Sequence, residues 1–173
     1  AGKPTAKKDM AMQAIAYGSV YVARVALGAD PQQTLRAFRE AEAYPGPSLV
    51  IAYSHCIAHG YDLRNGLDQQ YKAVHCGHWP LMRYNPVLAD EGRNPFLLDS
   101  SKPDKTWREY TKLELRYRML AKAHPEEAER MLDLGQRQVE RRYAEYAEMA
   151  SRTAEDFAVD ARMSQFAASS NRA

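Results

Sequence analysis

The chain has 173 residues, of which 45% are hydrophobic and 27% charged, the composition of a globular domain with a single core. Lys and Arg number 24 against 22 Asp and Glu, with both signs mixed along the chain, so no basic face indicates a nucleic acid or an anionic membrane as partner. No apolar run reaches the ~20 residues of a membrane span, and the start lacks a secretory apolar segment, so we expect a cytoplasmic protein.

The first part of the chain alternates amphipathic and apolar segments, as a parallel sheet with helical crossovers does. We expect a helix over residues 10–17, a short β-branched strand over residues 20–27, and a helix that begins at Pro31 after the N-cap Asp30. A second strand, residues 48–54, is apolar on both faces, as is typical of the interior of a parallel sheet. Together these segments predict a right-handed βαβ unit.

The middle of the chain is less regular. Residues 65–78 are weakly helical, and residues 79–86 suit a short edge strand or an extended loop held by two prolines. Residues 86–103 show no clear period, so we expect them to cross the surface.

Beyond about residue 106 the pattern is purely helical. One amphipathic helix should end at His124, and a second should begin at Pro125, where two glutamates favour the positive end of its dipole. We expect an antiparallel pair packed on the sheet or on a neighbouring domain. The second helix carries a stripe with large rings, which are common at interfaces, so it packs either on its own domain or on another domain or homodimer partner. The stripe consists of Leu132, Val139, Tyr143 and Tyr146.

Soft metal ligands stand out among the residues that carry chemistry, because phosphate-binding loops and the usual zinc motifs are missing. They form two groups, His55, Cys56 and His59, and His75, Cys76 and His78. One hypothesis is a zinc site made of Cys56, His59, Cys76 and a histidine of the second group, although the spacing counts against it. The alternative is that Cys56 is a small buried residue and the histidines are ordinary polar side chains.

The position of Cys56 favours a functional role. It lies just past the end of the predicted strand 48–54, and ligands of open α/β sheets bind beyond the carboxyl ends of the strands.

Four segments together resemble the C-terminal part of the pyruvate:ferredoxin (flavodoxin) oxidoreductase family. They keep the family's order, from about Ala1 to about Met149, and read KKDMAMQAIAYGSVYVARVALGAD, GPSLVIAYSHCIAHG, GHWPLMRYNP and GRNPFLLDSSKPD. The resemblance implies that residues 1–105 are the closing half of a thiamine pyrophosphate-binding α/β domain. Residues 106–152 would then be a C-terminal helical pair and residues 153–173 an irregular tail.

The resemblance also implies an activity. Family members decarboxylate pyruvate oxidatively in the presence of coenzyme A, with thiamine pyrophosphate and Mg²⁺, and pass electrons through 4Fe-4S clusters to ferredoxin or flavodoxin. Cys56 matches the distant fourth ligand of the cluster nearest the thiamine, whereas Cys76 stands where members tend to have serine, so we expect only Cys56 to bind metal.

We expect this chain to be a fragment, because it begins with alanine and lacks the family's motifs for Mg²⁺ and pyrophosphate. Alone it should be inactive, and its expected partners are the remainder of the same enzyme and a second copy in a homodimer. The alternative is a non-catalytic α/β module that docks on another chain.

Overall fold

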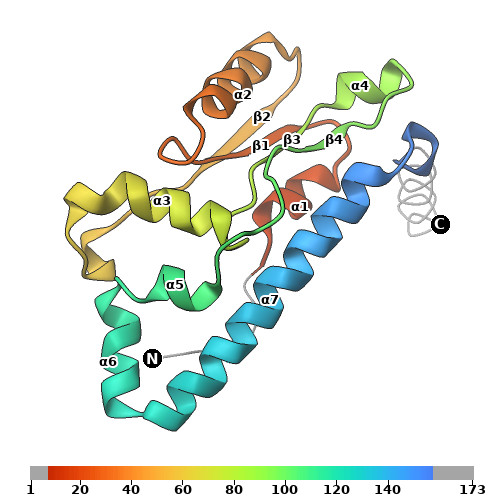
Figure 1. Ribbon diagram of the computed structural model, residues 1–173. Helices are drawn as coiled ribbons and strands as arrows, with labels where there is room; N and C mark the ends of the chain where they lie inside the picture. Colours follow the sequence, from red (N-terminus) through yellow and green to blue (C-terminus); the bar gives the residue numbers. More distant parts are fainter. Residues whose placement is uncertain (1–7, 158–173) are drawn as a thin grey trace, which may run out of the picture.

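A four-stranded mixed sheet forms the centre of the computed structural model, which describes residues 8–157 (Figure 1). The strand order is β2-β1-β3-β4, with bounds Tyr21–Val25 for β1, Ser48–Ala52 for β2, Met82–Tyr84 for β3 and Phe96–Leu98 for β4. β1 and β2 are parallel and are joined through helix α2, Pro31–Ala43. The predicted α/β class and βαβ unit are therefore confirmed.

Half of the sheet differs from the sequence prediction. β3 pairs antiparallel with β1 and β4, and β3 lies inside the sheet with all three residues buried, so its prediction as an edge strand was wrong. β2 was predicted in the interior but lies at the edge, where its residues are exposed or half-buried. The segment 86–103, expected to be irregular, contains a short helix and β4.

The helices lie on both sides of this sheet. In Figure 1, α2 covers one face while α1 and the long α7 cover the other. The remaining bounds are Met10–Ile15 for α1, Gly66–His75 for α3, Pro86–Asp90 for α4, Trp107–Thr111 for α5, Leu115–Ala123 for α6 and Pro125–Ser151 for α7, with two 3-10 turns, η1 at Ile57–His59 and η2 at Leu63–Asn65. Within residues 8–157, no helix has the length and apolarity that crossing a membrane requires.

Local capping explains where several helices begin. The carboxylate of Asp30 accepts a hydrogen bond from the backbone N–H of Gln33, which fixes the start of α2 as predicted. Thr106 and Glu109 form a capping box at α5. The helix expected up to His124 is split into α5 and α6, because Glu114 has an extended backbone and a buried carboxylate.

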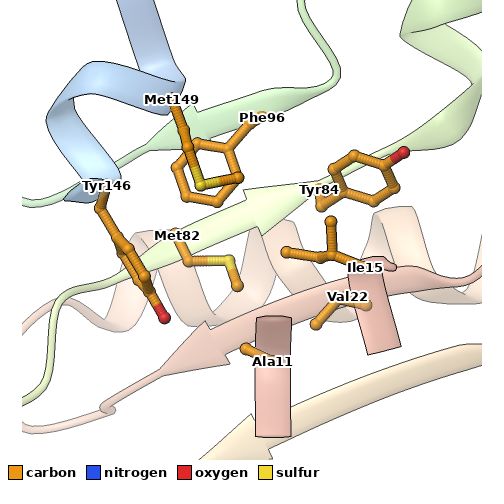
Figure 2. Packing of buried hydrophobic residues seen from close by; sticks show 8 residues of the cluster. All are labelled: Ala11, Ile15, Val22, Met82, Tyr84, Phe96, Tyr146 and Met149. Carbon is orange, nitrogen blue, oxygen red and sulfur yellow. The ribbon is translucent and has the colours of Figure 1, made fainter. Parts of the chain in front are cut away.

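The main core lies between the sheet and helices α1 and α7. Figure 2 shows α7 contributing Tyr146 and Met149, which pack on side chains from α1 and the strands. The ring of Tyr146 meets the ring of Phe96 nearly edge-on, with 5.4 Å between centroids. The cluster consists of Ala11, Ile15, Val22, Met82, Tyr84, Phe96, Tyr146 and Met149.

A buried arginine on this face ties α1, β1 and α7 together. Arg24 is 6% exposed, and its Nη1 donates a hydrogen bond of 3.0 Å to the hydroxyl of Tyr146. That hydroxyl donates in turn to Asp9 Oδ2 at 2.6 Å, and the Arg24 guanidinium lies 4.2 Å from the centre of the Trp79 ring. The buried charge is thus paired and satisfied.

The opposite face of the sheet has its own buried arginine. Arg83 is 7% exposed and donates two hydrogen bonds to the carboxylate of Asp99, at 2.9 and 2.7 Å, and one to Glu40 on α2. Glu40 also accepts a hydrogen bond of 2.9 Å from the hydroxyl of Tyr21. The network holds α2 against β1 and β3 beside an apolar cluster of Tyr21, Ala23, Val25 and Ala37.

Two apolar side chains of α2 do not join this core. Leu35 is 47% exposed and Phe38 53%, while Gln33 and Ala37 are the buried residues of the helix. The helix was predicted correctly, but the side chains that mark its apolar face point away from the sheet of this chain.

The apolar stripe of α7 packs on the chain's own core. Tyr146 is 1% and Val139 4% exposed, and Leu132 packs against the cluster that contains Val139. For Tyr146 and Val139 the hypothesis of an intermolecular interface is therefore wrong. Of the predicted tail 153–173, only residues 153–157 lie within the described part, and the division at residues 105 and 152 stays a prediction.

Replacing Tyr146 with phenylalanine tests the buried network. Tyr146→Phe removes the hydroxyl that joins Asp9 and Arg24, so we expect the free energy of unfolding to fall by about 1–3 kcal/mol. Tyr17→Phe is the matched control, because Tyr17 is 79% exposed. Denaturant unfolding of the complete enzyme that contains this chain measures both, and equal midpoints for Tyr146→Phe and the parent enzyme would contradict the network's contribution.

The chain expressed alone should be insoluble or molten. The edge of β2 is unpaired within the described part, and Leu35 and Phe38 are exposed nearby on α2. Size-exclusion chromatography and a thermal melt check this expectation. A monodisperse monomer of residues 1–173 with a cooperative transition would overturn it.

Candidate functional site

Cys56 lies at the carboxyl end of the parallel strand pair. β1 and β2 run in register from Tyr21 opposite Ser48 to Val25 opposite Ala52, so both strands end at the same edge of the sheet. The chain leaves β2 there and reaches Cys56 at the start of η1. The free thiol of Cys56 is exposed, as a ligand for an external group must be.

The backbone around Cys56 is held in a tight turn. The sulfur of Cys56 accepts a hydrogen bond from the N–H of Ala58 at 3.4 Å, which caps η1. The turn ends at Gly60 with a positive φ of 72°, and a Cβ there would lie 2.5 Å from Cβ of Leu115. A glycine is therefore required where the loop contacts α6.

Cys76 has a very different environment. The residue is 1% exposed and belongs to a buried cluster with Ala73, Trp107, Tyr110 and Val139, and its thiol donates a hydrogen bond to the carbonyl of Ala73 at 3.5 Å. Burial raises the pKa of Cys76 to about 12. Cys76 thus remains a protonated thiol at neutral pH and is a poor metal ligand.

The structure does not bring the two groups of soft ligands together. His75 pairs with Asp104 at 2.8 Å and stacks on Tyr71, while the ring of His78 stacks on Tyr110. His55 lies 3.3 Å from the side-chain amide of Gln70. Among residues 8–157, no cluster of three or more His, Cys, Asp or Glu side chains is arranged to hold a metal ion.

The buried carboxylate of Glu114 lies beside η1, the turn that begins at Cys56. Glu114 is 0% exposed and accepts hydrogen bonds from Gln69 on α3 at 3.1 Å and from Arg116 on α6 at 2.5 Å. His59 of η1 lies 3.9 Å from the same carboxylate. Residues from η1, α3 and α6 therefore meet at the carboxylate of Glu114.

Three tyrosines complete the polar surroundings. The hydroxyls of Tyr53 and Tyr110 are 2.7 Å apart, which joins the chain after β2 to α5. The hydroxyl of Tyr61 is buried and has no hydrogen-bond partner among the described residues. Sequence reasoning missed Glu114 and Tyr61, because neither belongs to a spacing pattern and each becomes notable only through its burial.

Apolar side chains are exposed around this edge of the sheet. Ile57, next to Cys56, is 78% exposed, and Leu115, which contacts Gly60, is 43% exposed. Leu27 follows β1 and is 57% exposed, while Leu63 and Leu67 on the next turns are 41% and 56% exposed. The exposed thiol is thus accompanied by exposed apolar side chains on the segments that follow β1 and β2.

Comparison with known proteins finds relatives that are named pyruvate-flavodoxin or pyruvate:ferredoxin oxidoreductases. The pyruvate-flavodoxin oxidoreductase of Nostoc sp. is 50% identical over 151 residues, 87% of this chain. The pyruvate:ferredoxin oxidoreductase of Moorella thermoacetica is 46% identical over 149 residues, and the probable pyruvate-flavodoxin oxidoreductase of Escherichia coli is 45% identical over 151 residues. No family model matches the chain.

The chain corresponds to a small part of these relatives. It spans 13% of the length of each of the three, although 86–87% of the chain is covered. The resemblance noted in the sequence is confirmed.

The two cysteines should differ in reactivity. In the metal-free form of the complete enzyme, an aqueous thiol reagent should modify Cys56 before Cys76, and Cys76 should react only on unfolding, because burial keeps it protonated. Peptide mass spectrometry after timed alkylation locates the label. Equal labelling of both thiols in folded protein would refute this assignment, and Cys76→Ala should leave the labelling of Cys56 unchanged.

Proposed function

We propose that this chain, a homologue of one segment of the pyruvate-flavodoxin and pyruvate:ferredoxin oxidoreductases, acts as part of such an enzyme. The complete enzyme would decarboxylate pyruvate oxidatively to acetyl-CoA and CO₂ and pass the electrons to ferredoxin or flavodoxin. The observation that carries the proposal is the exposed thiol of Cys56 at the carboxyl end of the parallel strands, in a chain 50% identical to such an enzyme.

The donor set of the chain suits one ligand of a 4Fe-4S cluster. Such a cluster is normally held by four cysteine thiolates, and it supplies one-electron transfer when bound. The chain has two cysteines, and the buried, protonated Cys76 is unsuited, which leaves Cys56. The other three thiolates would come from the remainder of the enzyme.

The residues around Cys56 would fix its thiolate and keep water away. The contact between Gly60 and Leu115, and the Glu114 carboxylate beside His59, hold the loop on α6. The exposed Ile57 and Leu67 offer apolar surface for a covering segment, and a dry environment strengthens electrostatic interactions with a bound cluster. Coverage by the remainder of the enzyme would complete the site.

The other expected partners belong to this proposal. Thiamine pyrophosphate and Mg²⁺ would bind outside this chain, and pyruvate and coenzyme A would react there. This chain alone is expected to be inactive. A homodimer and a cytoplasmic location complete the proposed setting.

A second candidate function is a non-catalytic module that docks on another chain. The exposure of Leu35 and Phe38 on α2 favours an uncovered docking face. A metal assay separates the two candidates, since iron and acid-labile sulfide in the native complex support the enzyme and their absence supports the module.

Replacing Cys56 in the full-length enzyme tests the proposed ligand. Cys56→Ala leaves one iron without its protein ligand, so the cluster should be lost or degraded to a three-iron form. Decarboxylation should survive, while reduction of ferredoxin or flavodoxin should fall steeply. Iron analysis and the electron paramagnetic resonance spectrum of the reduced enzyme measure the effect.

The matched control is Cys76→Ala. It should keep all iron and cost only about 1 kcal/mol of stability, because it removes one buried sulfur. A full iron complement and unchanged cluster signals in Cys56→Ala would refute the assignment of Cys56.

A further inference from the structure

The side-chain amide of Gln70 bridges two segments that leave the carboxyl end of the parallel strands. Gln70 lies on α3 and is 5% exposed. Its Oε1 accepts a hydrogen bond of 2.8 Å from the N–H of Gly28, which follows β1. Its Nε2 lies 3.3 Å from Nδ1 of His55, which follows β2 and directly precedes Cys56. One buried side chain thus joins the residue before the candidate ligand to the end of the neighbouring strand.

The backbone N–H of Gly28 fixes the direction of both hydrogen bonds. Because an N–H group can only donate, the amide atom of Gln70 that faces Gly28 must be the oxygen, and the NH₂ group then faces His55. Nδ1 of His55 is therefore the acceptor, and the ring carries its proton on Nε2. A ring of similar shape without a nitrogen at this position could not accept the bond.

Close packing holds the same two segments against the first turn of α3. A Cβ at Gly28 would lie 2.6 Å from the Cα of Leu67, and a Cβ at Gly66 would lie 2.8 Å from Cε1 of His55. The start of α3 therefore lies directly on the chain after β1 and on the His55 ring. Both contacts require a residue without a side chain.

The bond to Gln70 is the last hydrogen-bonded attachment of the chain before Cys56. The N–H of Tyr53 still continues the strand ladder, because it donates to the carbonyl of Val25 at 2.9 Å. Between Tyr53 and Cys56, the only hydrogen bond to another element within residues 8–157 is that of His55 to Gln70. The place at which the chain enters the Cys56 turn thus depends on this side-chain bond.

We propose that Gln70 is a positioning residue for Cys56, which it holds through His55 at the end of β1. The inference rests on the proposed function. A cluster whose ligands come from separate segments needs each thiolate at a fixed place, because metal–ligand distances tolerate only small displacements and outer hydrogen bonds orient the ligands. Without the amide of Gln70, the segment before Cys56 loses its bond to α3, and the iron loses its ligand more readily.

The test is Gln70→Leu in the complete enzyme, which removes both hydrogen bonds and keeps a side chain of similar size. The cluster bound by Cys56 should lose iron more readily than in the parent enzyme. After mild oxidation, the electron paramagnetic resonance signal of the three-iron form should therefore rise severalfold. Iron analysis of the same samples measures the loss independently.

Gln33→Leu is the matched control. Gln33 is 3% exposed on α2, and its Nε2 donates to the carbonyl of Arg24 at 3.2 Å and to Asp99 at 2.9 Å. The substitution also removes two buried hydrogen bonds, but none of them reaches the Cys56 turn. The three-iron signal should stay at the level of the parent enzyme.

Two variants of His55 keep the test decisive if Gln70→Leu does not fold. His55→Phe keeps a ring beside Gly66 but removes the acceptor, so it should raise the three-iron signal as Gln70→Leu does. His55→Asn places a carbonyl oxygen near the position of Nδ1 and should stay close to the parent enzyme. Equal signals in the two His55 variants would overturn the inference, because the acceptor would then be irrelevant.

The outcomes separate this inference from the proposed function. Parent-level signals in Gln70→Leu and His55→Phe overturn the role of Gln70, while loss of iron in Cys56→Ala still supports Cys56 as the ligand. An equal rise in Gln33→Leu also overturns it, because a general loss of stability would then be the cause. Retention of all iron in Cys56→Ala instead removes the proposed function.

Discussion

Two buried arginines, one on each face of the sheet, determine which segments cover it. A guanidinium cannot lie in an apolar interior without acceptors, so Arg24 requires Asp9 and Tyr146, and Arg83 requires Glu40 and Asp99. The acceptors of Arg24 come from the start of α1 and from α7, and those of Arg83 come from α2 and the end of β4. Pairing these charges thus fixes α1 and α7 on one face and α2 on the other, and the strands between them carry the Cys56 loop.

The sequence revealed the parts of the fold whose signals are local. The N-cap Asp30 and the apolar strands predicted the βαβ unit, and the position of Cys56 followed from it. The sequence pattern did not predict β3 and β4 correctly, because three residues are too few to show an alternating period and β3 lies close to two prolines. Likewise, no local pattern could reveal that Leu35 and Phe38 stay exposed, because burial depends on what else covers the helix.

Some features of the candidate site are likewise visible in the sequence, whereas others depend on the fold. A cysteine after a strand is visible in a sequence, whereas the burial of Glu114 depends on η1, α3 and α6 meeting at one place. Soft ligands beside Cys56 and beside Cys76 suggested a zinc site although their spacing counted against it, and the fold directs His75 and Cys76 into separate surroundings. The exposure of Leu27, Ile57 and Leu115 also has no sequence signature, because it depends on what the rest of the fold covers.

The bond from Tyr146 to Asp9 joins residues 137 positions apart, and the bond from Arg24 to Tyr146 joins residues 122 apart. Contacts of such long range form late, because closing a large loop costs entropy before any contact compensates for it. During synthesis on the ribosome, Arg24 and the apolar face of the early strands would therefore remain exposed to solvent until α7 has been synthesised. That interval is when the nascent chain is most exposed to aggregation and most dependent on chaperones.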